Sequence, residues 1–173
     1  RQAARIQREL GYLPGEIAFF DGMKGLEYLR FMSRMRGRKW AGRADEMLER
    51  FQLDPSGRIK RMSKGMKQKL GLVAALMHDP AILILDEPTS GLDPLMQAAF
   101  AQLILDEKRR GKTVLMSSHS FEEIEKTCDR VGILKDGRMQ GLVQADTLRG
   151  HRRRAYVVRF DRPEDQAAFA ASG

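Results

Sequence analysis

The sequence contains little cysteine and no long apolar run, and each of these shortages excludes a class of protein. Its single cysteine, Cys128, excludes an internal disulfide and a Cys-rich metal site. The longest uninterrupted apolar stretches, Leu72–Met77 and Ala81–Leu85, are far too short to cross a bilayer. No apolar stretch near the start follows a basic flank, so no export signal is predicted. We therefore expect a cytosolic chain.

The chain also lacks the phosphate-binding pattern G-x-x-x-x-G-K-[ST], in which backbone amides and a lysine neutralise the phosphates of a nucleotide. Gly37 and Gly42 have the right spacing, as do Gly132 and Gly137, but neither pair is followed by Lys-Ser or Lys-Thr. Neither pair follows a predicted strand and opens a helix. Both matches are therefore interpreted as accidental.

The 173 residues are 42% apolar and 31% charged, a balance typical of a soluble domain with a sizeable core. The net charge of +8 is compatible with three interpretations: nucleic-acid binding, contact with anionic lipid, or a solvated charged surface. Aromatic residues make up 7% of the chain and do not interleave with the basic clusters around Arg36 and Arg152. Because single-strand binding needs such aromatics, no nucleic-acid partner is expected.

Helical and strand-like segments alternate along the chain, which predicts an α/β fold with a mostly parallel sheet flanked by helices. Apolar residues at helical spacing predict a helix between Gly25 and Gly37 and a second one over residues 44–51. A third helix is predicted up to Met77, opened by Ser63, which is a good N-cap residue. These three helices predict a helical subdomain.

The second half of the chain reads as strands separated by one long helix. The stretch Ala81–Leu85 lacks polar alternation, so a strand buried on both faces is predicted. Asp93, followed by proline, opens the next helix, and Thr113–Met116 predicts a further strand. A hairpin is predicted from Arg130–Lys135 and Arg138–Val143, around an Asp-Gly turn.

The character of the sequence changes near its end. After residue 146 a basic run leads into a predicted strand, Tyr156–Phe160, and a predicted helix over residues 164–171. We therefore divide the chain into a main domain, residues 1–146, and the start of an accessory module, residues 147–173.

Two adjacent carboxylates, Asp86 and Glu87, directly follow the predicted buried strand. Ligands of open α/β sheets bind at this end of the strands, and carboxylates there are costly unless they are paired or bound to a cation. Since side chains alternate along a strand, the two can take different tasks. Asp86 is predicted to hold Mg²⁺ through water, and Glu87 to polarise the water that attacks a γ-phosphate. Taken alone, such a pair is more commonly a solvated helix cap or an ion pair.

Two further positions are candidates for binding a phosphate group. His119 follows the strand Thr113–Met116, so it is predicted near the same sheet edge, where an imidazole can bond a γ-phosphate and orient water. Ser63 and the free amides of its helix form an anion site, to which Lys64 adds positive charge. The alternatives are a surface histidine and an ordinary amphipathic helix with a serine cap.

Three motifs together resemble one family. The segment Ala81–Pro94 resembles the Walker B motif and D-loop of ABC-type ATPases, Met62–Leu72 resembles their signature motif, and Ser117–Ser120 resembles their switch-histidine loop. Their order and spacing agree with the family from about residue 10 to about residue 143. The residues of the signature motif at Gly65–Lys69 resemble those of the branch of the family that powers drug, antibiotic and lipid exporters.

The resemblance implies ATP and Mg²⁺ as cofactors and assigns catalytic roles. It implies that Asp86 holds Mg²⁺, that Glu87 is the general base and that His119 contacts the γ-phosphate. Gly15 stands where the family has a glutamine that helps to hold magnesium, and Glu16 beside it is the candidate substitute.

The resemblance also implies a second ATPase subunit, identical or different, as a partner. Ser63, Lys64 and Gly65 then serve the γ-phosphate of the ATP held by that partner, and Asp93 contacts the opposing subunit. A separate transmembrane permease is expected to meet the helix around Tyr28 and Phe31. The subunit is then cytoplasmic and peripheral at the inner face of the membrane.

Within residues 1–146 the resemblance implies a helical, signature-bearing subdomain over about residues 20–77 and a Walker B and switch-histidine core over residues 78–146. Compared with the family, the N-terminal strands and the phosphate loop (Walker A) are expected to be missing. We therefore expect an ATP-hydrolysing subunit of an ABC exporter that is inactive in this form. The alternatives are a non-catalytic ABC remnant that acts by partner binding and an ABC-like ATPase of nucleic-acid metabolism.

Overall fold

The computed structural model describes residues 2–37 and 42–150. It divides into two compact units, Arg1–Asp129 and Arg130–Gly173, which are described separately. Within the described ranges, no helix combines the length and apolarity that crossing a bilayer requires.

The first unit alternates helices and strands in the order expected for an α/β fold. Its elements are α1 (Gln2–Glu9), β1 (Leu10–Leu13), α2 (Gly25–Met35), α3 (Gly42–Arg50), the short 3₁₀ helix η1 (Ile59–Arg61), α4 (Lys64–Leu76), β2 (Ile82–Asp86), α5 (Pro94–Arg109), β3 (Thr113–Ser117) and α6 (Phe121–Thr127).

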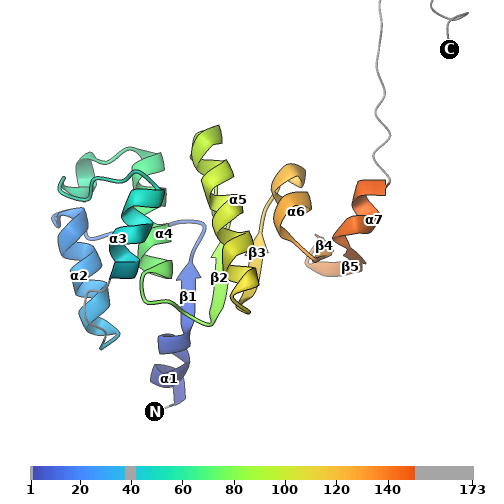
Figure 1. Ribbon diagram of the computed structural model, residues 1–173, viewed down its shortest axis with the longest axis horizontal. Coiled ribbons are helices and arrows are strands. Elements are labelled where there is room, and N and C mark those ends of the chain that lie inside the picture. Colours follow the sequence, from blue (N-terminus) through green and yellow to red (C-terminus); the bar gives the residue numbers. More distant parts are fainter. Residues whose placement is uncertain (1, 38–41, 151–173) are drawn as a thin grey trace, which may run out of the picture. The chain divides into compact units, whose positions relative to one another are not determined.

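The three strands of this unit form one parallel sheet in the order β1-β2-β3 (Figure 1). The register pairs Leu13 with Leu85 and Asp86 with Ser117. Parallel neighbours need a long crossover connection, and the chain supplies one through α2–α4 between β1 and β2 and one through α5 between β2 and β3. The predicted parallel sheet flanked by helices is therefore confirmed.

The helix starts follow from their capping residues. The Ser63 hydroxyl accepts the backbone N–H of Met66 at 3.2 Å, and the Asp93 carboxylate accepts that of Met96 at 3.0 Å. Pro94 occupies the first turn of α5, where its missing N–H costs nothing. Each cap contributes about 1 kcal/mol.

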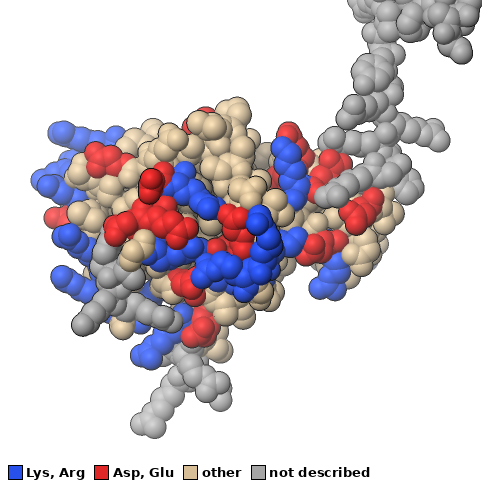
Figure 2. Space-filling view, in the orientation of Figure 1, with Lys and Arg blue, Asp and Glu red and all other residues tan. Residues whose placement is uncertain are grey.

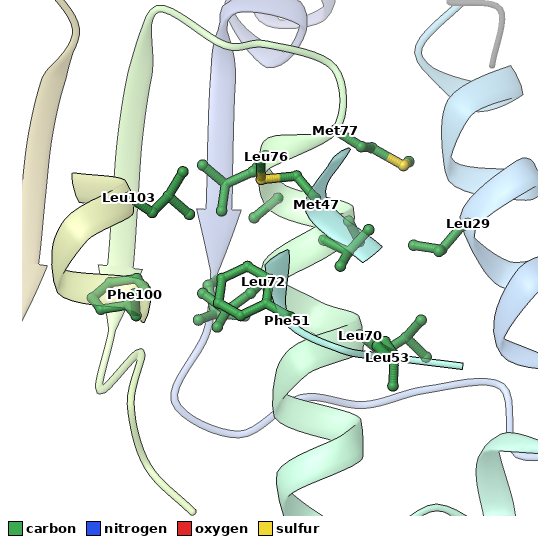
Figure 3. Close-up of a cluster of buried hydrophobic side chains, with 14 of the residues drawn as sticks. Leu29, Met47, Phe51, Leu53, Leu70, Leu72, Leu76, Met77, Phe100 and Leu103 are labelled. Atoms are coloured by element: carbon green, nitrogen blue, oxygen red, sulfur yellow. The ribbon is translucent and has the colours of Figure 1, made fainter. Parts of the chain in front are cut away.

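The core is a continuous cluster that joins the helical part to the sheet. Figure 3 shows Leu29 of α2 on one side of α4 and Phe100 and Leu103 of α5 on the other. All three side chains are at most 1% exposed, and so are Leu72 and Leu76 of α4 between them. The helical subdomain and the sheet therefore share one hydrophobic core.

The sheet is covered on one face only. Leu83 and Leu85 of β2 are buried in the core, whereas Ile82 is 43% exposed, on the same face of the sheet as the exposed Tyr12 of β1 and Leu115 of β3. The prediction that this strand is buried on both faces is therefore wrong for the described chain. A continuous apolar run places apolar side chains on both faces of a strand. The described helices cover only one of these faces in β2.

The second unit begins with the expected hairpin. Strands β4 (Arg130–Lys135) and β5 (Arg138–Gln144) pair antiparallel, and α7 (Ala145–Gly150) follows. Asp136 and Gly137 have φ angles of 49° and 71°, as a two-residue type I′ turn requires. The strand and helix predicted at Tyr156–Phe160 and 164–171 lie outside the described residues. The compact units divide earlier than the predicted boundary after residue 146, which stays a prediction.

The surface charges of the first unit are mixed rather than segregated. On the face shown in Figure 2, Lys and Arg gather along the edge over α2. Over the middle of this face, Asp and Glu are interspersed with other Lys and Arg side chains. Much of the mixing consists of ion pairs, such as Arg50 with Asp106 at 2.8 Å. This pattern is typical of a solvated charged surface.

Candidate functional site

The carboxyl ends of β2 and β3 bring the predicted chemistry together. Because Asp86 and Ser117 are register partners, the Ser117 hydroxyl donates a short hydrogen bond to the Asp86 carboxylate. The same hydroxyl accepts the backbone N–H of Glu87 at 3.1 Å. Ser117 therefore joins the two strand ends. Its role does not follow from the sequence alone, because it depends on the register between β2 and β3.

The Glu87 backbone leaves the strand direction abruptly. Its φ angle of 47° lies in the left-handed region, which a non-glycine residue adopts at a cost of about 1 kcal/mol. Gln68 of α4 supports this turn, because its side-chain amide donates to the carbonyl oxygens of Pro88 at 2.9 Å and of Glu87 at 3.2 Å. Strained backbone held by surrounding contacts is typical of functional sites.

The carboxylate of Glu87 meets the imidazole of His119. The distance between Glu87 Oε2 and His119 Nδ1 is 2.7 Å. A carboxylate accepts, so Nδ1 is the donor in this pair. The His119 side chain is 84% exposed and that of Glu87 is 34% exposed, so a substrate in solution can reach both. Two residues predicted as catalytic thus lie in direct contact.

The loop after β1 passes against Asp86. A Cβ atom at Gly15 would lie 2.8 Å from Asp86 Oδ2, so any larger residue here would have to displace the Asp86 carboxylate. Glu16, the next residue, is exposed. Across residues 2–37 and 42–150, no three His, Cys, Asp or Glu side chains are placed to hold a metal ion. Asp86 and Glu16 are therefore not part of a metal site built from protein ligands alone.

Magnesium does not need such a site. It keeps several waters and is usually held by one or two carboxylates together with the phosphates of a substrate. The Asp86 carboxylate with the Ser117 hydroxyl beside it fits this mode of binding, because both offer oxygen ligands at the ends of neighbouring strands.

The predicted anion-binding residues Ser63, Lys64 and Gly65 form a separate part of the candidate site. Ser63 is exposed and caps α4. It lies about 7.5 Å along the helix axis from Gln68, the residue of α4 that contacts the backbone of Glu87. A Cβ atom at Gly65 would lie 2.7 Å from the carbonyl oxygen of Gly91, and the aliphatic stem of Lys64 also lies along Gly91. The start of α4 thus packs against the loop between β2 and α5.

Asp93 directly precedes α5. It is exposed, and its carboxylate caps α5 through the Met96 amide. The structure therefore gives Asp93 a local structural role. The predicted contact with an opposing subunit stays a prediction.

Comparison with known proteins identifies the class to which this fold belongs. Residues 1–125 match a family model described as "AAA domain, putative AbiEii toxin, Type IV TA system". A solved structure of an ATP-binding subunit of an ABC transporter superposes with a TM-score of 0.76 at 29% identity, covering 86% of this chain and 64% of that one. The ATP-binding cassette MJ0796, solved as a dimer bound to ADP and phosphate, superposes with a TM-score of 0.73 at 22% identity, which shows the fold alone.

Curated relatives name the family more closely. An uncharacterised ABC transporter ATP-binding protein of Methanocaldococcus jannaschii is 36% identical over 138 residues, which are 77% of this chain and 53% of the relative. The linearmycin resistance ATP-binding protein LnrL of Bacillus subtilis is 36% identical over 144 residues, which are 80% of this chain and 46% of the relative.

The ATP-binding cassette sub-family A member 2 of Rattus norvegicus is 35% identical over 162 residues, which are 89% of this chain and 6% of the relative. The chain thus spans about half the length of the microbial relatives and a small part of this much longer one. The chain belongs to the family of ABC-type ATPases. The resemblance identified from the three motifs is confirmed.

Proposed function

We propose that this chain carries the Walker B, signature and switch-histidine elements of the ATP-hydrolysing subunit of an ABC exporter. The observation that carries the proposal is the contact of 2.7 Å between Glu87 and His119, next to Asp86 at the ends of two parallel strands. The name of the relative LnrL, a linearmycin resistance ATP-binding protein, supports the exporter branch, as does the wording of the signature.

In this proposal Glu87 is the general base. Its carboxylate takes a proton from the water that attacks the γ-phosphate, and His119 orients that water and bonds a phosphate oxygen. Their hydrogen bond holds the two side chains in one place before substrate arrives. Asp86 and Ser117 would hold Mg²⁺, largely through water, and the bound ion would neutralise charge that develops on the phosphates.

The signature residues Ser63, Lys64 and Gly65 are proposed to bind the γ-phosphate of an ATP on a second ATPase subunit. The exposed start of α4, a helix of 13 residues, offers free amides and the positive end of a helix dipole. Lys64 adds a charge at the same end. Asp93 is proposed to face that second subunit as well, and Glu16 to assist at the magnesium site.

A separate membrane permease is the proposed partner of α2. Phe20 and Phe31 pack edge to face with ring centroids 5.8 Å apart, and they are 57% and 37% exposed. Exposed aromatic side chains in contact are typical of protein interaction surfaces. The subunit would then lie at the cytoplasmic face of a membrane without entering it.

The 173-residue polypeptide alone is proposed to bind ATP poorly and to hydrolyse it negligibly, because it contains no phosphate-loop pattern. The same observation favours a second candidate, a non-catalytic ABC module that acts by binding its partner. The complete reading frame that encodes this chain distinguishes the two, because its product either binds and hydrolyses ATP or does neither.

The test of the catalytic assignment is Glu87→Gln in the product of that reading frame. We expect ATP hydrolysis to fall by about 10²–10⁴-fold, the usual contribution of a general base, while ATP stays bound. Glu122→Gln is the matched control, since Glu122 is an exposed carboxylate that pairs with Lys126 at 2.7 Å. Turnover that survives in Glu87→Gln would show that another group is the base.

A further inference from the structure

A buried carboxylate in α6 has no task in the function proposed above. Glu123 is 8% exposed, although carboxylates are rarely buried without a cation. Within the described chain no Lys or Arg forms an ion pair with it, and its Oε1 atom is buried without a hydrogen-bond partner. Burial, assisted by the negative charge of Glu87, raises the pKa of Glu123, while its hydroxyl partners and His119 oppose the rise.

The other oxygen of Glu123 joins two loops that are distant in sequence. Glu123 Oε2 accepts the Thr89 hydroxyl at 3.3 Å and a short hydrogen bond from the Ser118 hydroxyl. Thr89 comes two residues after Glu87, and Ser118 directly precedes His119. The carboxylate thus holds a neighbour of each member of the Glu87–His119 pair.

Each of these loop residues is in turn bonded to its own loop. Ser118 Oγ accepts the Ser120 amide at 3.0 Å, and the Thr89 carbonyl accepts the Leu92 amide at 3.0 Å. Both loops and α6 line a pocket of about 340 Å³, with Thr89, His119 and Glu123 in its wall. A change at Glu123 therefore reaches both loops at once.

Glu123 is itself held in place. Its backbone N–H donates to Ser120 Oγ at 3.4 Å, and its carbonyl accepts the Thr127 hydroxyl at 2.7 Å. The charged side chains nearest to it are Glu87 and His119 from the two loops, with Glu122 and Lys126 on its own helix, and those two pair with each other. None of these contacts consumes the Oε2 atom that serves the loops.

We propose that Glu123 is a positioning residue that locks the loop after Glu87 to the loop before His119 and so keeps these two side chains in contact. The catalytic meaning of the lock rests on the proposed function, but the lock itself does not. It acts through two accepted hydroxyl hydrogen bonds, and a neutral glutamine can accept the same two bonds.

Amide hydrogen exchange in the 173-residue chain tests the lock without ATP. In Glu123→Ala we expect the amides of Leu92 and Ser120 to exchange about tenfold faster, the effect of one lost net hydrogen bond. In Glu123→Gln both amides should keep their protection. Glu122→Gln, the same substitution one residue earlier on the exposed face, should leave both unchanged.

A second variant serves where Glu123→Ala fails to fold. Thr89→Val removes one hydroxyl donor with little change of shape, and we expect the Ser120 amide in the other loop to exchange faster as well. Where Glu123→Ala does fold, adding Thr89→Val to it should have no further effect on exchange of the Ser120 amide, because both changes break the same connection.

In the product of the complete reading frame, Glu123→Ala should lower kcat about 10²-fold, as for a misplaced catalytic pair, with KM nearly unchanged. Glu123→Gln should restore kcat, whereas a general base at this position would lose it with either substitution. Faster exchange confined to α6 itself, or an equal effect of Glu122→Gln, would overturn the inference. A product without ATPase activity would end the proposed function, while the exchange result would still decide whether Glu123 joins the loops.

Discussion

Glu107 is the buried anion on which the strongest stability prediction depends. It lies on α5, is 1% exposed, and forms short ion pairs with Arg43 of α3 and with Lys112. Arg110 adds a contact at 3.0 Å. Burial alone would raise the pKa of Glu107, but the hydrogen bond from Lys112 and the charge of Arg43 outweigh it, so the pKa lies below its usual value. Glu107 is therefore charged in the folded protein at neutral pH.

Replacing Glu107 by glutamine keeps the shape of the side chain and removes its charge. No cavity forms, so the effect isolates the ionic contribution. Removing one partner of a buried ion pair costs about 3–5 kcal/mol, because the other partner is left uncompensated. Arg43 retains Glu46 at 2.9 Å, and Lys112 retains a short contact with Asp79. We therefore expect the lower end of that range, about 3 kcal/mol.

Urea denaturation measures this loss. With a slope of about 2 kcal/mol per molar urea, the unfolding midpoint of Glu107→Gln should fall by about 1.5 M. Glu122→Gln is the matched control on an exposed carboxylate, where the loss should stay below about 0.5 kcal/mol. Equal midpoints for the two variants would refute the reasoning, because they would show that the buried cluster contributes no more than a surface ion pair.

Two further predictions concern acid stability and the start of α4. Burial opposes the ionised form of Asp79, but hydrogen bonds from Lys112 and Arg110 lower its pKa from 3.8 to about 2, so its contribution is present above pH 3.8 and is lost as the pH falls toward 2. The Asp79 side chain is 43% exposed, so solvent screening reduces its contribution to the free energy of unfolding to about 1 kcal/mol. When the free energy of unfolding is measured against pH, Asp79→Asn should therefore make it depend less on pH in that acid window. Gly65→Ala should destabilise the chain by about 1–3 kcal/mol in thermal melts, because its Cβ atom would meet the Gly91 carbonyl at 2.7 Å. An unchanged melting temperature would mean that the loop around Gly91 shifts at no cost in stability.

The local patterns of the sequence predicted the elements that they encode directly. Capping residues such as Ser63 and Asp93 stand at the helix starts where they were expected, and the Asp-Gly turn closes the hairpin. The helix α6 was missed because its seven residues carry little apolar periodicity. Its signal was present in Ser120 followed three residues later by Glu123, the pattern of a capping box.

Tertiary contacts account for what the sequence could not predict. The run Ala81–Leu85 is apolar on both faces of its strand, but this run does not determine which elements cover each face. Ile82 is therefore exposed in spite of its apolar side chain. In the same way, the roles of Gln68 and Ser117 depend on which elements pack together. Candidate catalytic residues can be recognised in a sequence from their residue types. The residues that hold them in place can be identified only from the three-dimensional structure.

The strand register explains why Glu87 and His119 nevertheless lie close together. Asp86 pairs with Ser117, so Glu87 and His119 each follow closely on a strand end. A slip by one residue would turn every side chain of β3 to the other face of the sheet. The core residues Val114 and Met116 would then face away from α5, so the hydrophobic pattern opposes the slip. The packing of the sheet thereby fixes the approach of the two loops, and the hydroxyl and carboxylate contacts refine it.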